Sequence, residues 1–176
     1  TKNVLRYTRD DQEQNHAAVE QQIKVVESII EAKNRTVGAL WQVNLGGHAV
    51  AMKANALTQV FLNLGVNALE AVSDLPKEDR WVSATAVVQN DKLCIDWSNG
   101  GPPISERVQK NLFKRGYSTK GDAGSGIGLY VSQRLIKQAG GELICINTSS
   151  HPCFRLVLPL ALEENIIISS DPMDLN

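Results

Sequence analysis

The glycine-rich stretch between residues 99 and 128 limits the folds open to this chain more than any other feature. It holds seven of the 13 glycines, together with the pair Pro102-Pro103. Because glycine and proline clusters interrupt helices and strands, only one short helical patch is predicted inside it, near 106–113. The core therefore has to come from the residues on either side. A chain of 176 residues with a hydrophobic fraction of 43% is long enough for one such domain.

The second half of this stretch has the features of an anion site. Gly124-Ser-Gly126-Ile-Gly128 opens a predicted helix, and glycines there let the backbone approach a phosphate closely. The helix start adds unpaired N–H groups and the positive end of the helix dipole. Ser118, Thr119 and Lys120 lie just upstream and supply hydroxyl donors and a positive charge. We therefore predict a polyphosphate site, although the glycines alone also fit a plain loop-to-helix joint.

Hydrophobic periodicity on both sides of this stretch predicts helices and strands in alternation. Asn55 is a candidate N-cap, and Asn90-Asp91 is the expected two-residue turn of a hairpin. The predicted helices cover about 16–34, 55–72 and 127–138, and the predicted strands cover 37–45, a short segment ending at 52, 82–88, 93–97, 143–147 and 154–158. Hairpins separated by helices favour an α+β fold, in which one sheet packs on one helical layer as a two-layer sandwich.

Charge and cysteine content argue against several kinds of function. The 18 basic and 19 acidic residues give a formal net charge of -1, whereas a nucleic-acid-binding surface needs a basic excess. No apolar run reaches the roughly 18 residues of a membrane span. Cys94, Cys145 and Cys153 lie apart in strand-like runs, which indicates buried thiols and no zinc site. The chain begins at Thr1 without a methionine or signal peptide, so we expect a fragment of a longer protein.

Three polar residues share one face of the helix predicted over 55–72. Asn63, Asn67 and Glu70 follow one another at steps of four and three, beside the apolar stripe. Side-chain oxygens are the ligands that Mg²⁺ prefers, and Mg²⁺ commonly arrives with phosphates. The same spacing also fits ordinary solvent-facing positions, but the glycine-rich stretch favours a ligand site.

Four segments, taken in order, resemble the sequence boxes of the ATP-binding catalytic domain of sensor histidine kinases. The segments are NLGVNALEA (63–71), SNGGPPI (98–104), LFKRGYSTKG (112–121) and GSGIGLYVSQRLIKQAGGEL (124–143). They are similar to the N box, the first glycine box, the F box and the second glycine box of a superfamily that includes gyrase B, Hsp90 and MutL. FRLVLPL (154–160) looks like the closing strand, so the resemblance covers about 19–160. It implies a sandwich of the Bergerat type, with a mixed, mostly antiparallel sheet packed on about three helices.

The resemblance implies that the ligands are ATP and Mg²⁺, and it gives the boxes their roles. Asn67 would hold Mg²⁺ at the phosphates, with Asn63 as a second metal ligand and a catalytic residue. Lys120 would be the other catalytic residue. The remaining expected nucleotide contacts are Asn99, Gly101, Phe113, Tyr117, Ser118, Thr119, Gly124, Gly126, Ile127, Gly128 and Leu129. In this set Phe113 and Tyr117 would anchor a short lid over the site.

Two positions depart from the family pattern. The first glycine box usually carries an Asp that accepts a hydrogen bond from the adenine amino group, and Asn99 stands at that position here. Asn keeps an acceptor oxygen without the charge, so weaker adenine binding is expected. A turn residue before Gly100 is the rival interpretation.

ATP-hydrolysing relatives carry a Glu at the position of Asn63. Because Asn cannot act as a general base, transfer to a protein group is expected instead of hydrolysis.

The phosphoacceptor histidine of such kinases lies on a separate helical hairpin. None of His16, His48 and His151 has the sequence context expected of it, so we expect the acceptor upstream of this chain. LRYTR (5–9) looks like the last turn of that hairpin.

The expected organisation follows from these assignments. Residues 1–15 would be the hairpin end and a linker, 16–160 the ATP-binding catalytic domain, and 161–176 a C-terminal tail or linker. The last segment faintly resembles the start of a receiver domain, and a plain linker fits it equally well. By resemblance, the partners are the hairpin of the same kinase and a response regulator or receiver domain. The fragment would be monomeric, and the parent a homodimer anchored in the inner membrane with this domain in the cytoplasm. A degenerate nucleotide-binding or partner-docking module is the alternative that Asn99 leaves open.

Overall fold

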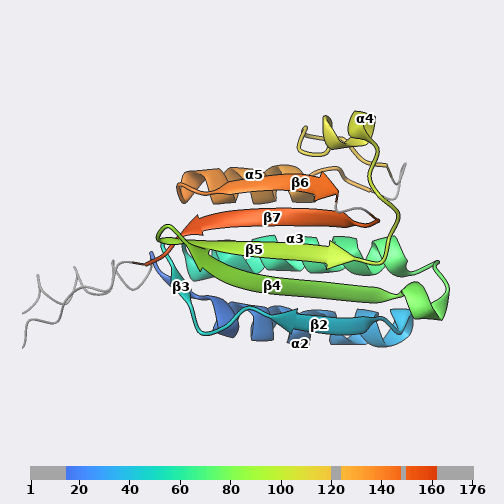
Figure 1. Cartoon of the computed structure of the whole chain (residues 1–176), viewed down its shortest axis with the longest axis horizontal. Coiled ribbons are helices and arrows are strands. Elements are labelled where there is room, and N and C mark those ends of the chain that lie inside the picture. Colours follow the sequence, from blue (N-terminus) through green and yellow to red (C-terminus); the bar gives the residue numbers. More distant parts are fainter. Residues whose placement is uncertain (1–14, 120–123, 148–149, 162–176) are drawn as a thin grey trace, which may run out of the picture.

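The computed structural model describes residues 15–119, 124–147 and 150–161, which form a sheet with helices on one face (Figure 1). The strands are β1 (Ala17–Ala18), β2 (Leu40–Asn44), β3 (Ala49–Val50), β4 (Trp81–Gln89), β5 (Lys92–Asn99), β6 (Glu142–Asn147) and β7 (Pro152–Pro159). The helices are α2 (Val19–Val37), α3 (Ala54–Val72), α4 (Glu106–Gln109) and α5 (Gly128–Gln138), with a 3-10 turn at Lys77–Asp79. Within these ranges, no helix is long and apolar enough to cross a membrane.

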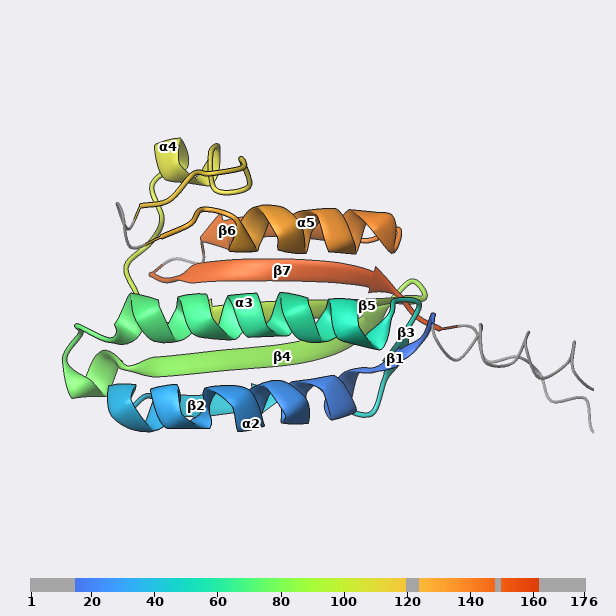
Figure 2. The same cartoon turned by 180° about the vertical axis from the view of Figure 1, so that it is seen from behind.

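The main sheet has five strands in the order β2-β4-β5-β7-β6. β2 and β4 run parallel, and the other neighbouring pairs are antiparallel. The short strands β1 and β3 pair separately. Figure 2 shows α2, α3 and α5 over the same face of the sheet, with α3 in the middle. The two-layer sandwich predicted from the sequence is therefore confirmed, including its mixed, mostly antiparallel sheet.

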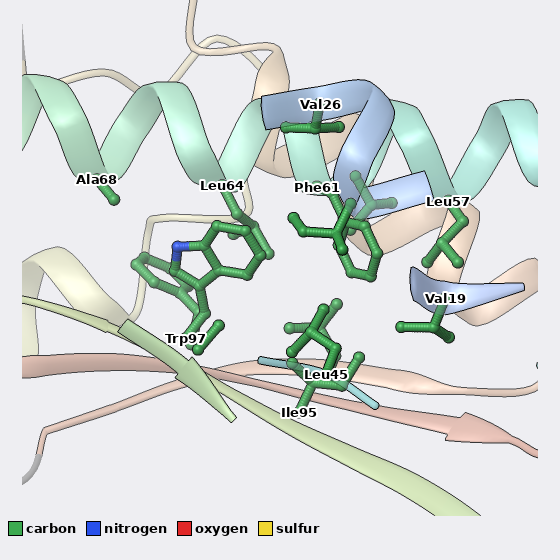
Figure 3. Packing of buried hydrophobic residues seen from close by; sticks show 14 of the residues in the cluster. Val19, Val26, Leu45, Leu57, Phe61, Leu64, Ala68, Ile95 and Trp97 are labelled. Carbon is green, nitrogen blue, oxygen red and sulfur yellow. The ribbon is translucent and has the colours of Figure 1, made fainter. Parts of the chain in front are cut away.

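The helix α3 takes the central position because apolar side chains recur along it at helical spacing. Leu57, Phe61 and Leu64 are buried, and Figure 3 shows them on the side of α3 that faces Ile95 and Trp97 of β5. The ring centroids of Phe61 and Trp97 lie 5.9 Å apart. Burial of side chains of this size contributes about 1.5–3 kcal/mol each. This packing fixes where the polar face of α3 stands relative to the end of β5.

The hairpin of β4 and β5 turns at Asn90-Asp91, as predicted. Both residues have a positive φ, 50° and 58°, which a type I′ turn requires and which Asn and Asp tolerate. The register of this hairpin ends with the pair Val82 and Asn99. The glycine-rich stretch thus begins where β5 leaves the sheet.

Two helix limits differ from the sequence prediction. α3 begins at Ala54 with Lys53 in the cap position and no side-chain cap bond, so the N-cap role predicted for Asn55 is wrong. α2 continues to Val37, where a strand was expected to begin, and ends at Gly38. The φ of Gly38 is 68°, and a left-handed glycine is the usual way to stop a helix.

Candidate functional site

A cleft of about 690 Å³ opens between α3, the loop after β5 and the segment that leads into α5. From α3, the cleft is lined by Asn63, Asn67 and Glu70, which the sequence placed on one helix face. Because α3 packs directly on α5, this polar face meets the glycines at the start of α5. The helix stripe and the glycine-rich segment therefore belong to one site.

The carboxylate of Glu70 is held in an ion pair beside the cleft. Nζ of Lys33 in α2 lies 2.7 Å from Oε1 of Glu70, and their side chains are 40% and 35% exposed. A pair this exposed contributes only about 0–1 kcal/mol to stability. Its effect on the site is electrostatic, since the lysine offsets a negative charge that would repel an anionic ligand.

Asn63 connects α3 to the first turn of α5. Its Nδ2 donates to the carbonyl oxygen of Gly128 and to Oγ of Ser132, each at 3.0 Å. Its Oδ1 accepts from Nε2 of Gln59 at 3.2 Å. The side chain predicted as a metal ligand and catalytic residue thus also holds the two helices of the site together.

The glycine loop before α5 lies against the end of the F-box segment. The φ of Gly126 is 62°, and its carbonyl oxygen accepts from the N–H of Gly116 at 3.0 Å. A Cβ at Gly126 would stand 2.4 Å from the carbonyl carbon of Gly116 and 2.7 Å from the nitrogen of Tyr117. Only glycine permits this approach of two backbones, so it fixes how residues 116–119 enter the cleft.

Asn99 lines the cleft at the point where β5 ends, which we call the inner end of the cleft. It is only 3% exposed, and its Oδ1 accepts from the N–H of Gly101 at 2.9 Å. This bond is typical of a residue that begins a turn, and the side chain of Asn99 also lines the cleft. A Cβ at Gly100 would stand 1.9 Å from the carbonyl oxygen of Asp79, so the next residue must be glycine.

Asn147, the last residue of β6, and His151, just before β7, hold the segment after β5 that contains Ile104 and forms the outer wall of the cleft. The side-chain amide of Asn147 bonds both the N–H and the carbonyl of Ile104, at 3.0 and 2.7 Å. Nδ1 of His151 lies 3.1 Å from the carbonyl oxygen of Gly101, and its ring packs edge-on against Trp81. Sequence reasoning missed Asn147 and His151, because these bonds join residues 43 and 50 positions apart and leave no local signal.

Most of the predicted site residues line this cleft. Those that do are Asn63, Asn67, Asn99, Gly101, Tyr117, Ser118, Thr119, Gly124, Gly126, Gly128 and Leu129. Phe113 is outside the lining and packs against the hydrophobic core, which suits an anchor better than a ligand contact. Ile127 is also outside the lining and is 46% exposed. Lys120 lies outside the described residues.

Apolar side chains that the sequence did not single out complete the cleft. Ile104, Val108 and Leu112 come from the segment after β5, and Pro152 and Phe154 come from β7. Glycines, side-chain amides, hydroxyl groups and the carboxylate of Glu70 lie in the other part of the lining. A cleft with an apolar part and a part rich in backbone donors suits a ligand with a flat aromatic group and a charged tail.

Comparisons with known proteins agree with this geometry. Residues 52–162 match the family model described as histidine kinase-, DNA gyrase B-, and HSP90-like ATPase. The sensor protein FixL of Bradyrhizobium diazoefficiens is 31% identical over 133 residues, which are 75% of this chain and 26% of FixL. The sensory histidine kinase/phosphatase NtrB of Rhizobium leguminosarum bv. phaseoli is 28% identical over 130 residues, 67% of this chain and 34% of NtrB. The chain thus spans about a quarter to a third of these relatives.

Solved structures with the same fold come from histidine kinases. The catalytic domain of histidine kinase ThkA, in a nucleotide-free form, superposes with a TM-score of 0.71 at 23% identity, over 82% of this chain and 93% of that domain. The mycobacterial sensor histidine kinase MprB gives a TM-score of 0.71 at 17% identity, over 82% of this chain and 96% of that one. At these identities the likeness concerns the fold.

Proposed function

Because the chain belongs to the family of histidine kinase-, DNA gyrase B- and HSP90-like ATPases, we propose that its cleft binds Mg-ATP and presents the γ-phosphate to a histidine. The chain corresponds to the catalytic ATP-binding domain of sensor histidine kinases. Transfer to a histidine on a helical hairpin of the parent kinase is the activity that we propose for the whole protein.

The main support for this proposal is that four segments far apart in the sequence line one cleft. The polar face of α3, the loop after β5, residues 117–119 and the glycine loop before α5 all line it. The base of the nucleotide would lie at the inner end, beside Asn99 and the apolar wall. The phosphates would lie where backbone N–H groups at the start of α5 and the hydroxyls of Ser118 and Thr119 converge. Lys120 would add a positive charge there, as the family resemblance suggests.

The donor set fits a magnesium ion that arrives with the nucleotide. Among the described residues, no group of three His, Cys, Asp or Glu side chains could hold a metal ion. Asn67 and Asn63 offer amide oxygens in the cleft, and such hard oxygens suit Mg²⁺ when phosphates and water complete its shell. Bound there, Mg²⁺ would neutralise charge on the transferred phosphoryl group. The protein's part is to hold the phosphates in line and exclude water.

The site is better suited to transfer than to hydrolysis. Asn63 stands where a hydrolysing site needs a base, and an amide does not take up a proton at neutral pH. Its nitrogen is also engaged by Gly128 and Ser132. A bound ATP would therefore persist until an acceptor side chain enters the cleft.

The proposed partners follow from this role. They are the phosphoacceptor hairpin of the same kinase, which would make the parent a homodimer, and a response regulator or receiver domain that takes the phosphoryl group on. We propose that the domain works in the cytoplasm, as part of a membrane-anchored parent.

Calorimetric titration with a non-hydrolysable ATP analogue tests the nucleotide site. We expect binding that Mg²⁺ strengthens in the wild-type chain and that Asn67→Ala largely removes. Asn55→Ala is the matched control, because Asn55 is exposed on α3 away from the cleft lining. Absence of binding at millimolar analogue would instead favour a degenerate or partner-docking module. A longer protein that includes the hairpin would then be assayed for phosphohistidine.

A further inference from the structure

The side-chain amide of Asn63 is fully engaged on its nitrogen side. The amide nitrogen carries two hydrogens, and it has two acceptors, the carbonyl oxygen of Gly128 and Oγ of Ser132, each at 3.0 Å. Its donor capacity is therefore used within the fold. What Asn63 can offer to a ligand is its oxygen alone.

The orientation of this amide is determined by its partners. The carbonyl of Gly128 can only accept, so a flipped amide would set two oxygens against each other. Nε2 of Gln59 donates to Oδ1 at 3.2 Å, which agrees with the same orientation. The Gly128 carbonyl thus selects one of the two amide orientations, and the contacts with Ser132 and Gln59 are compatible with it.

Ser132 is the partner that the family resemblance does not explain. It is 0% exposed and lies one helical turn after Gly128, so both acceptors face α3 together. Serine is a poorer helix former than alanine in the interior of a helix. Its hydroxyl here reaches a side chain 69 positions away, at the edge of the cleft.

We propose that Ser132 is a positioning residue that, with the Gly128 carbonyl, holds Asn63 as a hydrogen-bond acceptor only. Asn63 then presents only its oxygen to the divalent cation, and it gives no N–H to a phosphate oxygen. This inference rests on the proposed function, because it deepens the role of one residue in the Mg-ATP site. In this proposal, residues of α5 determine the orientation of the Asn63 amide.

The test compares nucleotide binding with and without the cation in Ser132→Ala. We expect the affinity for the Mg-bound ATP analogue to fall roughly three- to tenfold, the loss expected for one hydrogen bond that fixes a ligand-binding group. The affinity measured in EDTA should stay within about twofold, since Asn63 gives nothing to the phosphates. Ser28→Ala, an exposed serine of α2, is the matched control. Ser132→Thr keeps the hydroxyl and should restore the magnesium effect.

Nuclear magnetic resonance of the side-chain amides supplies a readout that does not depend on ligand. The two protons of Asn63, assigned by their disappearance in Asn63→Ala, should both be shifted downfield, and Ser132→Ala should return one of them toward the free-amide position. Thermal unfolding shows whether each variant is folded.

The outcomes separate this inference from the proposed function. Equal losses of affinity with and without Mg²⁺, or unchanged affinities and amide shifts, overturn the role of Ser132 while nucleotide binding stands. A wild-type chain that binds neither form overturns the proposed function, and the inference falls with it.

Discussion

The side-chain amide of Asn147 pairs with the backbone of Ile104 as one amide pairs with another across a sheet. Oδ1 accepts from the N–H of Ile104 at 3.0 Å, and Nδ2 donates to its carbonyl at 2.7 Å. Gln59 and Asn63 bond within one helix, but this pair joins β6 to the loop after β5, 43 positions earlier. The loop after β5, which forms this wall of the cleft, is thus held in place by β6.

Replacement of Asn147 should loosen that wall without unfolding the domain. Asn147→Ala removes two hydrogen bonds from an exposed position, which costs about 0.5–1.5 kcal/mol each at most. We expect a small drop in melting temperature and a roughly three- to tenfold weaker affinity for an ATP analogue, because the loop loses its preorganisation. Calorimetry checks the affinity against Asn44→Ala, an exposed asparagine of β2 outside the cleft lining. Equal affinities in the two variants would contradict this role.

The glycine loop gives a prediction with a built-in control. Gly116 and Gly126 both have a positive φ, 77° and 62°, but only a Cβ at Gly126 would meet other atoms. Gly116→Ala should cost about 1–2 kcal/mol of stability, the usual penalty of a left-handed alanine, and leave nucleotide affinity nearly intact. Gly126→Ala must also push residues 116 and 117 away, and we expect at least about tenfold weaker binding from that displacement. Titration of both variants with the ATP analogue, together with their unfolding curves, tests this difference. Similar affinities in the two variants would show that binding does not need the close contact of Gly126 with residues 116 and 117.

Local signals explain why so much of the fold could be predicted from the sequence. The alternation of Leu93, Ile95 and Trp97 marked β5, and the turn at Asn90-Asp91 fixed the register of its hairpin. The apolar stripe of α3 marked the helix that carries Asn63 and Asn67. These patterns are set by residues within a few positions of one another, which is why one sequence is enough to read them.

The parts that could not be predicted depend on contacts between distant segments. Nothing near Ser132 or Asn147 indicates that their side chains reach 69 and 43 positions along the chain. The N-cap assigned to Asn55 failed because α3 starts one residue earlier, at Ala54, without any capping side chain. The buried apolar face of α3, from Leu57 onward, stabilises the helix without a capping side chain. The sequence therefore predicts which segments line the cleft, but it does not predict the side chains that hold those segments in place.

The thiol of Cys145 makes stability depend on pH at the alkaline end. Burial, with a smaller contribution from the neighbouring Cys153, raises the pKa of Cys145 from 9.0 to about 11. The folded state then keeps the proton at pH values where the unfolded chain has released it. The free energy of unfolding should therefore be highest below pH 9 and fall as the pH rises toward 11.

Urea unfolding at pH 8 and pH 10.5 measures this fall in stability, and the fall should be smaller in Cys145→Ala. A part of it should remain, because burial also raises the pKa of Cys153; an identical fall in the variant would exclude Cys145 as a cause.

Asn99→Asp is the sharpest test of how the inner end of the cleft recognises a base. Oδ1 of Asn99 already accepts from the N–H of Gly101 at 2.9 Å, so an aspartate could keep that bond with one oxygen. Its second oxygen would then be free to accept from the amino group of adenine, in a bond about twice as strong as a neutral one. After the cost of burying the charge, we expect roughly tenfold tighter binding of the ATP analogue, about 1.4 kcal/mol.

The base itself supplies the control for that substitution. Inosine triphosphate carries a carbonyl in place of the amino group, so Asn99→Asp should not strengthen its binding and should weaken it through repulsion between oxygens. Asn90→Asp adds the same charge at an exposed turn far along the hairpin and should alter neither affinity. Calorimetric titration of both nucleotides against the three proteins gives the comparison. Equal tightening for ATP and inosine triphosphate would mean that the charge acts through the loop at Gly101, and Asn99 would then be a turn residue alone.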